Sequence, residues 1–148
     1  MPGVSMKLEN QKHIDAPKSI VWSVTEDVER WPEWTPTVES IKRLDEGPFT
    51  VGSTALIKQP GMSEAKWRVT ALAVGEGFSW ETSIRGIHIV ATHEMSTADG
   101  GTQSVLRVET SGIVAVLMWP LIRVSAPRSL AQENAALKAH CEALVPAS

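Results

Sequence analysis

His93 is the residue of this chain whose type and position best suit chemistry. It lies in residues 91–95, where apolar and polar side chains alternate and predict a strand with odd-numbered residues facing inward. A buried imidazole needs partners for its ring nitrogens, so one interpretation is a core histidine bonded to backbone or water. The other is a catalytic or ligand-binding residue, which donates a hydrogen bond to a ligand or acts as a general acid or base with a pKa tuned by burial.

The other reactive side chains are less well placed for catalysis or metal binding. Cys141 falls within the apolar stripe of a predicted helix, which is typical of core packing, and a single cysteine excludes an internal disulfide. His93 and Glu94 are adjacent on a strand and therefore point to opposite faces. The sequence has no pair of ligands at the spacing of a zinc site, no glycine-rich phosphate loop and no nucleophile elbow. We therefore expect no metal and no cofactor.

Arg123 interrupts the apolar run 113–124 and has two interpretations. A surface arginine can lay its aliphatic stem along apolar neighbours and keep its charge in water. Alternatively, it is a cation at the mouth of a cavity that holds a carboxylate or enolate, with Met118 and Trp119 lining the same mouth. The run itself could also be an exposed patch for a homodimer or for a membrane surface.

The bulk composition predicts one soluble domain over residues 1–148. Hydrophobic residues make up 43% of the chain and charged residues 21%, which is ordinary for a globular protein. The net charge of −3, with interspersed signs, argues against a nucleic-acid partner. The longest apolar run, 113–122, contains Pro120 and is half the roughly 20 residues that a membrane span needs, so no transmembrane segment is expected. The N-terminus lacks the apolar core of a signal peptide, which favours a cytoplasmic location.

The pattern of elements predicts an α+β domain. A helical pattern occupies residues 16–24 and must stop before Pro32, and a second one occupies residues 129–144. The preceding segment 113–128 should be a bent or two-part helix, because Pro120 and Pro127 interrupt it. Strands are expected at 6–14, 64–73, 78–84, 87–97 and 102–111, with less regular patterns at 38–44 and 51–58.

Three turns predict how the later strands pair. We take Gly100-Gly101 and Arg85-Gly86 as two-residue loops and residues 74–77 as a four-residue loop. His93 then lies between Phe78 and Val108, and Glu94 lies opposite Arg107 on the solvent face. One face carries a set that is either a plain core or the wall of an apolar pocket: Trp67, Phe78, Trp80, Ile84, Ile87, Ile89, Met95, Leu106 and Val108.

Residues 13–41 carry a resemblance to a known family. Their pattern of Ile-x-Ala-Pro, Val-Trp, an aspartate and Trp-Pro-x-Trp comprises Ile14, Ala16, Pro17, Val21, Trp22, Asp27, Trp31, Pro32 and Trp34. Gly101-Thr102 and residues 137–142 are also similar. The chain resembles the polyketide cyclase/dehydrase family of the START-like, pollen-allergen-like superfamily known as SRPBCC.

This resemblance implies a helix-grip fold, in which a curved antiparallel sheet wraps a long C-terminal helix and two short helices follow the first strand. An elongated cavity would lie between sheet and helix. Trp31 would pack the short helices against the sheet, and Trp34 would reach the cavity, held in place by Pro32 and Pro36.

The resemblance and the inward set together predict binding of a small hydrophobic, lipid- or polyketide-like molecule. One alternative is a polyketide cyclase or dehydratase in which His93 moves a proton next to a carbonyl, without metal or cofactor. Another is a protein-interaction or stress-response module, which would have a solid core. The expected ligand contacts are Trp34, Trp67, Phe78, Trp80, Ile89, His93, Met95, Leu106, Val108, Met118, Trp119 and Arg123.

Overall fold

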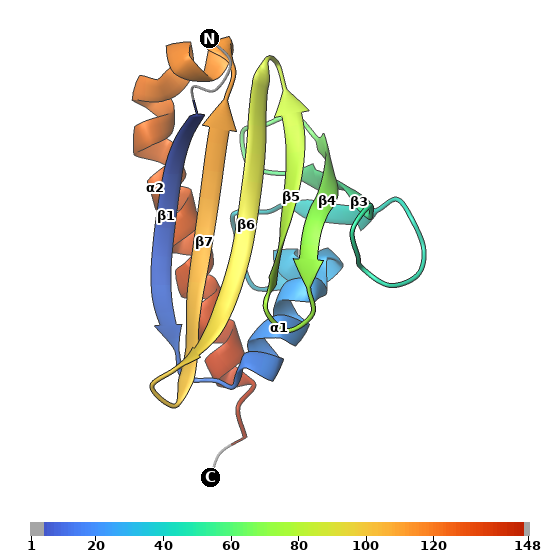
Figure 1. The fold of residues 1–148 in the computed structure, drawn as a ribbon, viewed down its shortest axis with the longest axis vertical. Coiled ribbons are helices and arrows are strands. Elements are labelled where there is room, and N and C mark those ends of the chain that lie inside the picture. The colour runs from blue at the N-terminus through green and yellow to red at the C-terminus, as the bar shows by residue number, and fades with distance from the viewer. Residues whose placement is uncertain (1–4, 147–148) are drawn as a thin grey trace.

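The computed structural model describes residues 5–146 and has the predicted α+β helix-grip architecture (Figure 1). Seven strands form one antiparallel sheet in the order β1-β7-β6-β5-β4-β3-β2. The elements are β1 (Ser5–Ile14), α1 (Lys18–Glu26), the 3-10 helix η1 (Val28–Glu33), β2 (Ser40–Arg43), β3 (Thr54–Lys58), β4 (Ala65–Ala73), β5 (Gly77–Ile84), β6 (Ile87–Ala98), β7 (Gly101–Ser111) and α2 (Ile113–Ala143).

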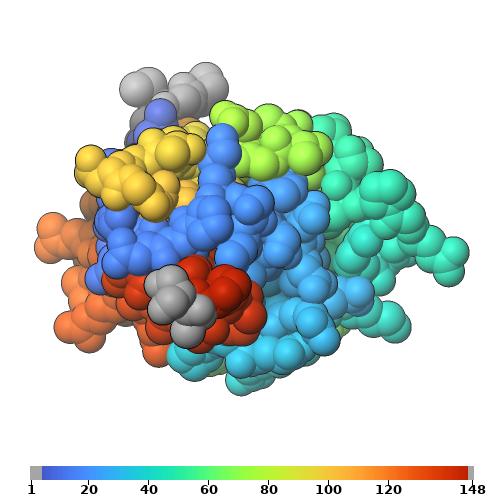
Figure 2. Space-filling model, turned by 90° about the horizontal axis from the view of Figure 1, so that it is seen from below, coloured from blue at the N-terminus to red at the C-terminus, as the bar shows by residue number. Residues whose placement is uncertain are grey.

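The second half of α2 packs on the inner face of the sheet through Leu130, Leu137 and Cys141, which are all buried. Asn134 interrupts this apolar stripe and is fully buried. Its side-chain amide donates to Asn10 Oδ1 at 2.9 Å, and its oxygen accepts from the Ser104 hydroxyl at 2.8 Å. Figure 2 shows the last turns of α2 lying against the N-terminal third of the chain. The helix is thus fixed to β1 and β7.

Of the two alternatives expected over 113–128, a bent or a two-part helix, the two-part helix is wrong, because α2 is one helix of 31 residues that contains both prolines. A proline removes the hydrogen bond to the carbonyl four residues earlier. Here those carbonyls belong to Val116 and Arg123, which lie on the exposed first half of the helix.

The hairpin at Arg85-Gly86 has the predicted register. Ile84 pairs with Ile87 and Phe78 pairs with His93. Arg85 and Gly86 have φ angles of 49° and 83°, the left-handed pair of a two-residue hairpin turn.

The next hairpin turns one residue earlier than predicted, at Asp99-Gly100, so His93 pairs with Leu106 and not with Val108. The pairing moves by two residues in total, and side chains alternate with a period of two, so every predicted face is preserved. Glu94 lies opposite Val105 instead of Arg107, yet the Arg107 guanidinium still reaches its carboxylate at 3.0 Å.

The predicted length of the β4–β5 loop was also wrong, because Ala73 pairs with Gly77 and leaves three loop residues instead of four. That change alone would turn Trp67 outward. A β-bulge between Val69 and Ala71 shifts the register again, and Trp67 is buried on the same side as Trp80. The predicted shared face is therefore correct, for a reason that the sequence did not reveal.

Candidate functional site

A cavity of about 510 Å³ lies between the inner face of the sheet and α2. This volume falls within the range of roughly 300–1,000 Å³ that small-molecule sites occupy. Its walls come from four parts of the chain. The segment 31–38 contributes mainly Trp31, Thr37 and Val38, and β3 with the loop after it contributes Ile57, Gln59, Pro60 and Met62. Strands β4 to β7 contribute Trp67, Trp80, Ile87, Ile89, Ala91, His93, Leu106, Val108 and Thr110, and α2 contributes Ile122, Ser125, Ala126, Ser129, Leu130, Gln132 and Glu133.

Three indoles form the aromatic wall of this pocket. Trp80 lies at the centre, with ring centroids 5.5 Å from Trp31 and 5.7 Å from Trp67. The indole N–H of Trp31 donates to the carbonyl of Thr25 at 3.1 Å, at the end of α1. Trp31 therefore joins the short helices to the sheet and lines the pocket at once, which leaves its ring fixed before any ligand arrives.

His93 lines the pocket and is buried beside the aromatic wall. Its ring stacks on Phe78 at 4.9 Å and 15°, and its centroid is 4.9 Å from that of Trp31. Burial lowers the pKa of His93 to about 4, so the imidazole is neutral at neutral pH. Within residues 5–146 no side-chain hydrogen bond to its ring is present, and the ring nitrogens can serve a ligand.

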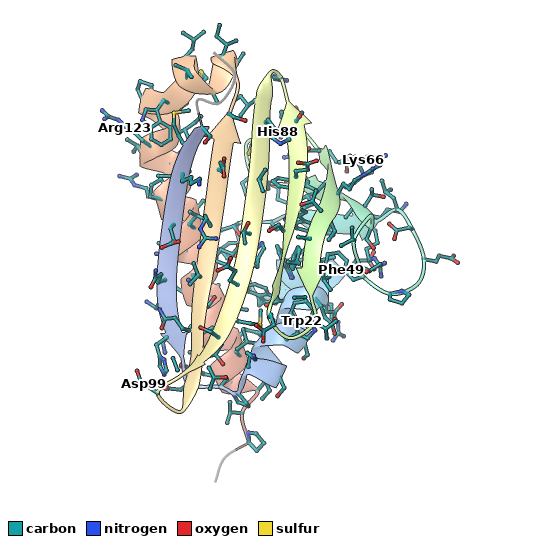
Figure 3. The ribbon with its side chains drawn as sticks, in the orientation of Figure 1. Trp22, Phe49, Lys66, His88, Asp99 and Arg123 are labelled. Atoms are coloured by element: carbon teal, nitrogen blue, oxygen red, sulfur yellow. The ribbon has the colours of Figure 1, made fainter. Side chains whose placement is uncertain are left out.

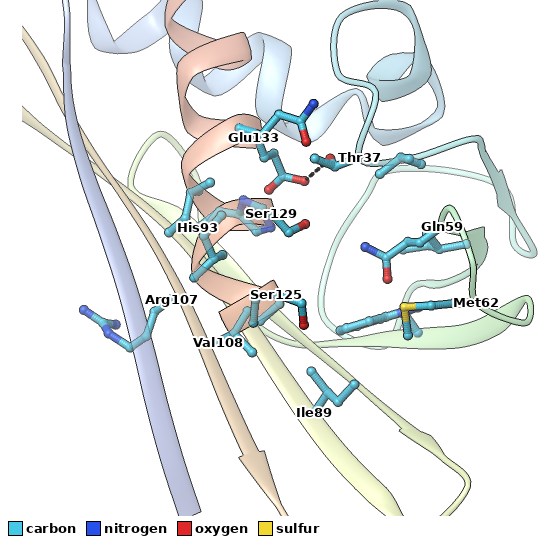
Figure 4. A pocket seen from close by; sticks show the side chains of 18 of the residues that line it. Thr37, Gln59, Met62, Ile89, His93, Arg107, Val108, Ser125, Ser129 and Glu133 are labelled. Atoms are coloured by element: carbon cyan, nitrogen blue, oxygen red, sulfur yellow. Dashed lines mark hydrogen bonds between the residues drawn. The ribbon is translucent and has the colours of Figure 1, made fainter. Parts of the chain in front are cut away.

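Glu133 is the pocket residue that sequence reasoning missed. It projects from α2, and its carboxylate accepts a hydrogen bond from the Thr37 hydroxyl at 3.1 Å (Figure 4). Burial raises the pKa of Glu133 to about 7, and the bond from Thr37 opposes that rise. The available signal was its spacing, three residues after Leu130 and four before Leu137, which places it beside the buried stripe.

The mouth of the pocket lies between α2 and the loop that follows β3. Exposed lining residues there include Pro60 and Met62 on the loop side and Ser125 and Ser129 on the helix side. Figure 4 shows Gln59 and Met62 across the opening from these serines. A ligand would therefore enter beside the middle turns of α2.

Half of the predicted contacts line the pocket: Trp67, Trp80, Ile89, His93, Leu106 and Val108. Phe78 and Met95 are buried outside its lining. Trp34, expected to reach the cavity, instead stacks on His140 with centroids 6.0 Å apart, and Trp31 occupies the place predicted for it. What any of these residues binds stays a prediction.

Met118, Trp119 and Arg123 lie on the first half of α2, away from the pocket lining. Figure 3 shows Arg123 on the outer side of the helix, pointing away from the sheet. This position agrees with the surface interpretation of Arg123, and the lining of the pocket gives the cationic-mouth interpretation no support. Arg107 is the one basic residue of the lining in the described chain, and its guanidinium pairs with Glu9 at 3.0 Å and with Glu94 on the outer face.

Two further chemistries have no support in the described residues. Burial and, to a smaller extent, the nearby Glu142 carboxylate raise the pKa of the Cys141 thiol to about 12. A thiol with so high a pKa is a poor nucleophile. Residues 5–146 contain no group of three histidine, cysteine, aspartate or glutamate side chains that could hold a metal ion.

Residues 5–142 match the protein family described as "Polyketide cyclase / dehydrase and lipid transport". No curated protein matches the chain significantly. Among solved structures, the Zhui aromatase/cyclase from Streptomyces sp. R1128 has a TM-score of 0.79 at 18% identity, over 97% of this chain and 98% of that one. Major latex-like protein 151 from Panax ginseng has a TM-score of 0.77 at 15% identity, over 97% of this chain and 100% of that one.

Identities this low show a shared fold alone, whereas the family match spans nearly the whole chain. The sheet order, the long terminal helix and the two short helices after β1 agree with both findings. This chain therefore belongs to the polyketide cyclase/dehydrase and lipid transport family and has the helix-grip fold of the SRPBCC superfamily.

Proposed function

We infer that this protein binds a small apolar molecule in the cavity between the sheet and α2. The observation that carries this inference is a largely apolar cavity of about 510 Å³ whose lining also includes a few polar groups, among them His93 and Glu133. Burial of apolar surface would drive binding at about 25 cal/mol per Å². The fixed indoles reduce the ordering cost on association.

The polar lining residues His93 and Glu133 favour an uncharged ligand group such as a hydroxyl, a phenol or a carbonyl. His93 is neutral there, and Glu133 with a pKa of about 7 is largely uncharged below neutral pH. A ligand carboxylate would approach Glu133 with no cationic side chain to hold it, because the Arg107 charge is on the outer face. Simple fatty acids should therefore bind less well than the corresponding alcohols.

Filling the cavity tests this proposal. Ala91 lines the pocket and pairs with Trp80, so Ala91→Phe places a ring in the space a ligand needs. We expect the neutral probe N-phenylnaphthylamine to bind saturably and quench tryptophan fluorescence. Ala91→Phe should weaken this binding at least about tenfold, the equivalent of 1.4 kcal/mol.

The matched control for this test is Ala139→Leu, which enlarges an exposed alanine on α2 and should leave probe affinity unchanged. Circular dichroism checks that both variants fold. Probe binding that survives in folded Ala91→Phe, or no saturable binding by the wild type, would contradict the proposal. Native mass spectrometry of gently purified protein would add the mass of a retained ligand.

A second candidate function is proton transfer on an enolisable carbonyl compound. The specific observation in its favour is that His93 and Glu133 line the same pocket with pKa values of about 4 and about 7. A neutral imidazole can accept a proton and a protonated carboxyl can donate one. This is the cyclase/dehydratase alternative, with Glu133 as a second participant.

Conservative variants separate the two candidates. If the protein is an enzyme, His93→Gln and Glu133→Gln should abolish exchange of the α-protons of a β-diketone with deuterated solvent while affinity is retained. If it is a carrier, the wild type should show no exchange above buffer and the variants should lose affinity only. The protein-interaction alternative required a solid core, and the cavity weighs against it.

A further inference from the structure

The first half of α2 exposes apolar side chains along one continuous face. Ile113, Leu117 and Leu121 are 77%, 74% and 60% exposed, and Val124 is 50% exposed. Their spacings of four, four and three place them on the same side of the helix, and Val116 flanks them. These five residues are called here the outer apolar face. A surface helix normally turns its polar side to solvent, so this arrangement is reversed and indicates an interaction site.

The charges around the outer apolar face have one sign. Residues 113–132 contain Arg123 and Arg128 and no acidic residue, although the whole chain has a net charge of −3. Arg128 follows Val124 by four residues and therefore continues the same face. Within residues 5–146 neither arginine forms an ion pair. The face is thus apolar with a positively charged continuation.

This charge pattern distinguishes the candidate occupants of the face. The helix segment offers no carboxylate to pair with Arg123 and Arg128 of a second copy docked through this face, so a dimer would leave these charges without partners on the helix. An anionic bilayer offers an apolar interior for the leucines and negative headgroups for the arginines. The lipid surface matches both properties of the face.

The way α2 is anchored excludes a membrane-spanning role for the folded protein. By length and composition alone, α2 is a helix that could cross a bilayer. Its second half, however, is held in the domain by buried Leu130, Leu137 and Cys141 and by the hydrogen bonds of Asn134. The helix can therefore lie on a membrane with its first half and cannot thread through one without unfolding.

We propose that the outer apolar face docks this protein onto the surface of bilayers that contain anionic lipids. In Figures 1 and 3 this half of α2 lies beyond the edge of the sheet, where a flat surface can reach it. Ile122 and Ser125 of the same turns line the pocket. Docking therefore brings the pocket mouth close to the lipids. Exchange of the apolar ligand between pocket and bilayer would be a further step, and it rests on the proposed function.

Flotation with lipid vesicles tests the docking. The full chain should float with vesicles of equal parts phosphatidylcholine and phosphatidylglycerol, and less with phosphatidylcholine alone or at high salt. Leu117→Gln combined with Leu121→Gln should lower the partition coefficient at least about tenfold. Arg123→Gln combined with Arg128→Gln should lower it about fivefold for each charge removed.

Matched controls come from exposed residues elsewhere. Val74→Gln changes a side chain that is 78% exposed in the β4–β5 loop, and Arg68→Gln changes an exposed arginine on β4. Both should float like the wild type. The pocket variant Ala91→Phe should also float like the wild type, so a failure of ligand binding is distinguishable from a failure of docking.

Three outcomes would overturn the docking proposal. The first is a wild-type chain that stays in solution with the anionic vesicles, and the second is a leucine double variant that floats as well as the wild type. The third is a dimer, measured by light scattering, that becomes a monomer on changing Leu117 and Leu121, because a second copy would then cover the face.

Discussion

At the scale of single residues, Asn134 and His93 are both buried polar side chains on inward faces, and they differ in what they bond. Asn134 uses its donors and its acceptor on Asn10 and Ser104. The His93 ring packs on aromatic side chains and lines the cavity. A buried polar group whose bonds are all satisfied fixes the fold, whereas one that faces a cavity is available to a ligand.

Changing Asn134 tests its structural role. In Asn134→Leu, the Ser104 hydroxyl and the Asn10 side chain lose their buried partner while an apolar group of similar size remains. We expect the free energy of unfolding to fall by about 2–4 kcal/mol, because unsatisfied buried groups carry their full desolvation cost. Urea unfolding followed by circular dichroism measures this loss.

Gln132→Ala is the control for that experiment, since Gln132 is an exposed residue two positions away on α2. Its unfolding midpoint should move little. A midpoint for Asn134→Leu within error of the wild type would show that the apolar contacts of α2 hold the helix in place without this amide.

The sequence allowed His93 to be placed and did not allow Glu133 to be found, and the difference has a physical cause. The facing of His93 follows from the predicted hairpin registers together with strand alternation, and a register shift of two residues leaves it unchanged. Glu133 owes its environment to Thr37, which comes from a distant loop and bonds its carboxylate. An acidic residue in a helix is normally solvated, and only the tertiary contact with Thr37 reveals that this carboxylate is partly withdrawn from solvent.

At the scale of elements, the glycine that opens β5 controls how closely β5 approaches β6. Gly77 has a φ angle of 149°, and a Cβ at this position would overlap the backbone oxygen of His93. Gly77→Ala should therefore push the two strands apart beside the pocket histidine. We expect a loss of about 2 kcal/mol or more in the free energy of unfolding, together with weaker probe binding.

Gly75→Ala is the matched control, because Gly75 lies two residues earlier, in the β4–β5 loop. Its φ angle is 78°, yet a Cβ there would meet no atom within 4 Å. The expected cost is about 1–2 kcal/mol from backbone strain alone, with unchanged probe affinity. Equal effects of the two substitutions on probe binding would contradict the link between Gly77 and His93.

The elements show which sequence rules were sufficient. The five longer strands were predicted to within one residue, because period-two alternation marks them. The shared face of Trp67, Phe78 and Trp80 is also as predicted, but it depends on a bulge that offsets the shorter β4–β5 loop. The bulge beside Val69 was not predicted, since no glycine or proline marks it. The sequence did not decide between a bend and a break at Pro120 and Pro127, and α2 runs unbroken through both.

At the scale of the whole molecule, α2 has two halves with opposite roles. The second half is the inner partner of the sheet and forms one wall of the pocket. The first half presents the outer apolar face to its surroundings. The order of elements and the family resemblance predicted the helix-grip fold. They did not predict the size of the cavity, which depends on how far the helix stands off the sheet.

The whole molecule also has a pH response that follows from the two buried pocket groups. Burial raises the pKa of Glu133 from 4.5 to about 7, so between these values the folded protein binds a proton that the unfolded chain releases. Its contribution to stability is therefore lost as pH rises through this window. Burial lowers the pKa of His93 from 6.5 to about 4, so its contribution is gained as pH rises from about 4 to 6.5.

These opposite slopes overlap in the wild type, and single variants should separate them. Relative to the wild type, Glu133→Gln should become more stable as pH rises from about 4.5 to 7, because it removes the falling contribution. His93→Gln should become less stable, relative to the wild type, as pH rises from about 4 to 6.5. Urea unfolding at a series of pH values gives both difference curves, with the exposed Glu26→Gln as a control. Difference curves that are flat, or slopes of the opposite sign, would show that solvent enters the pocket freely and that neither group is desolvated.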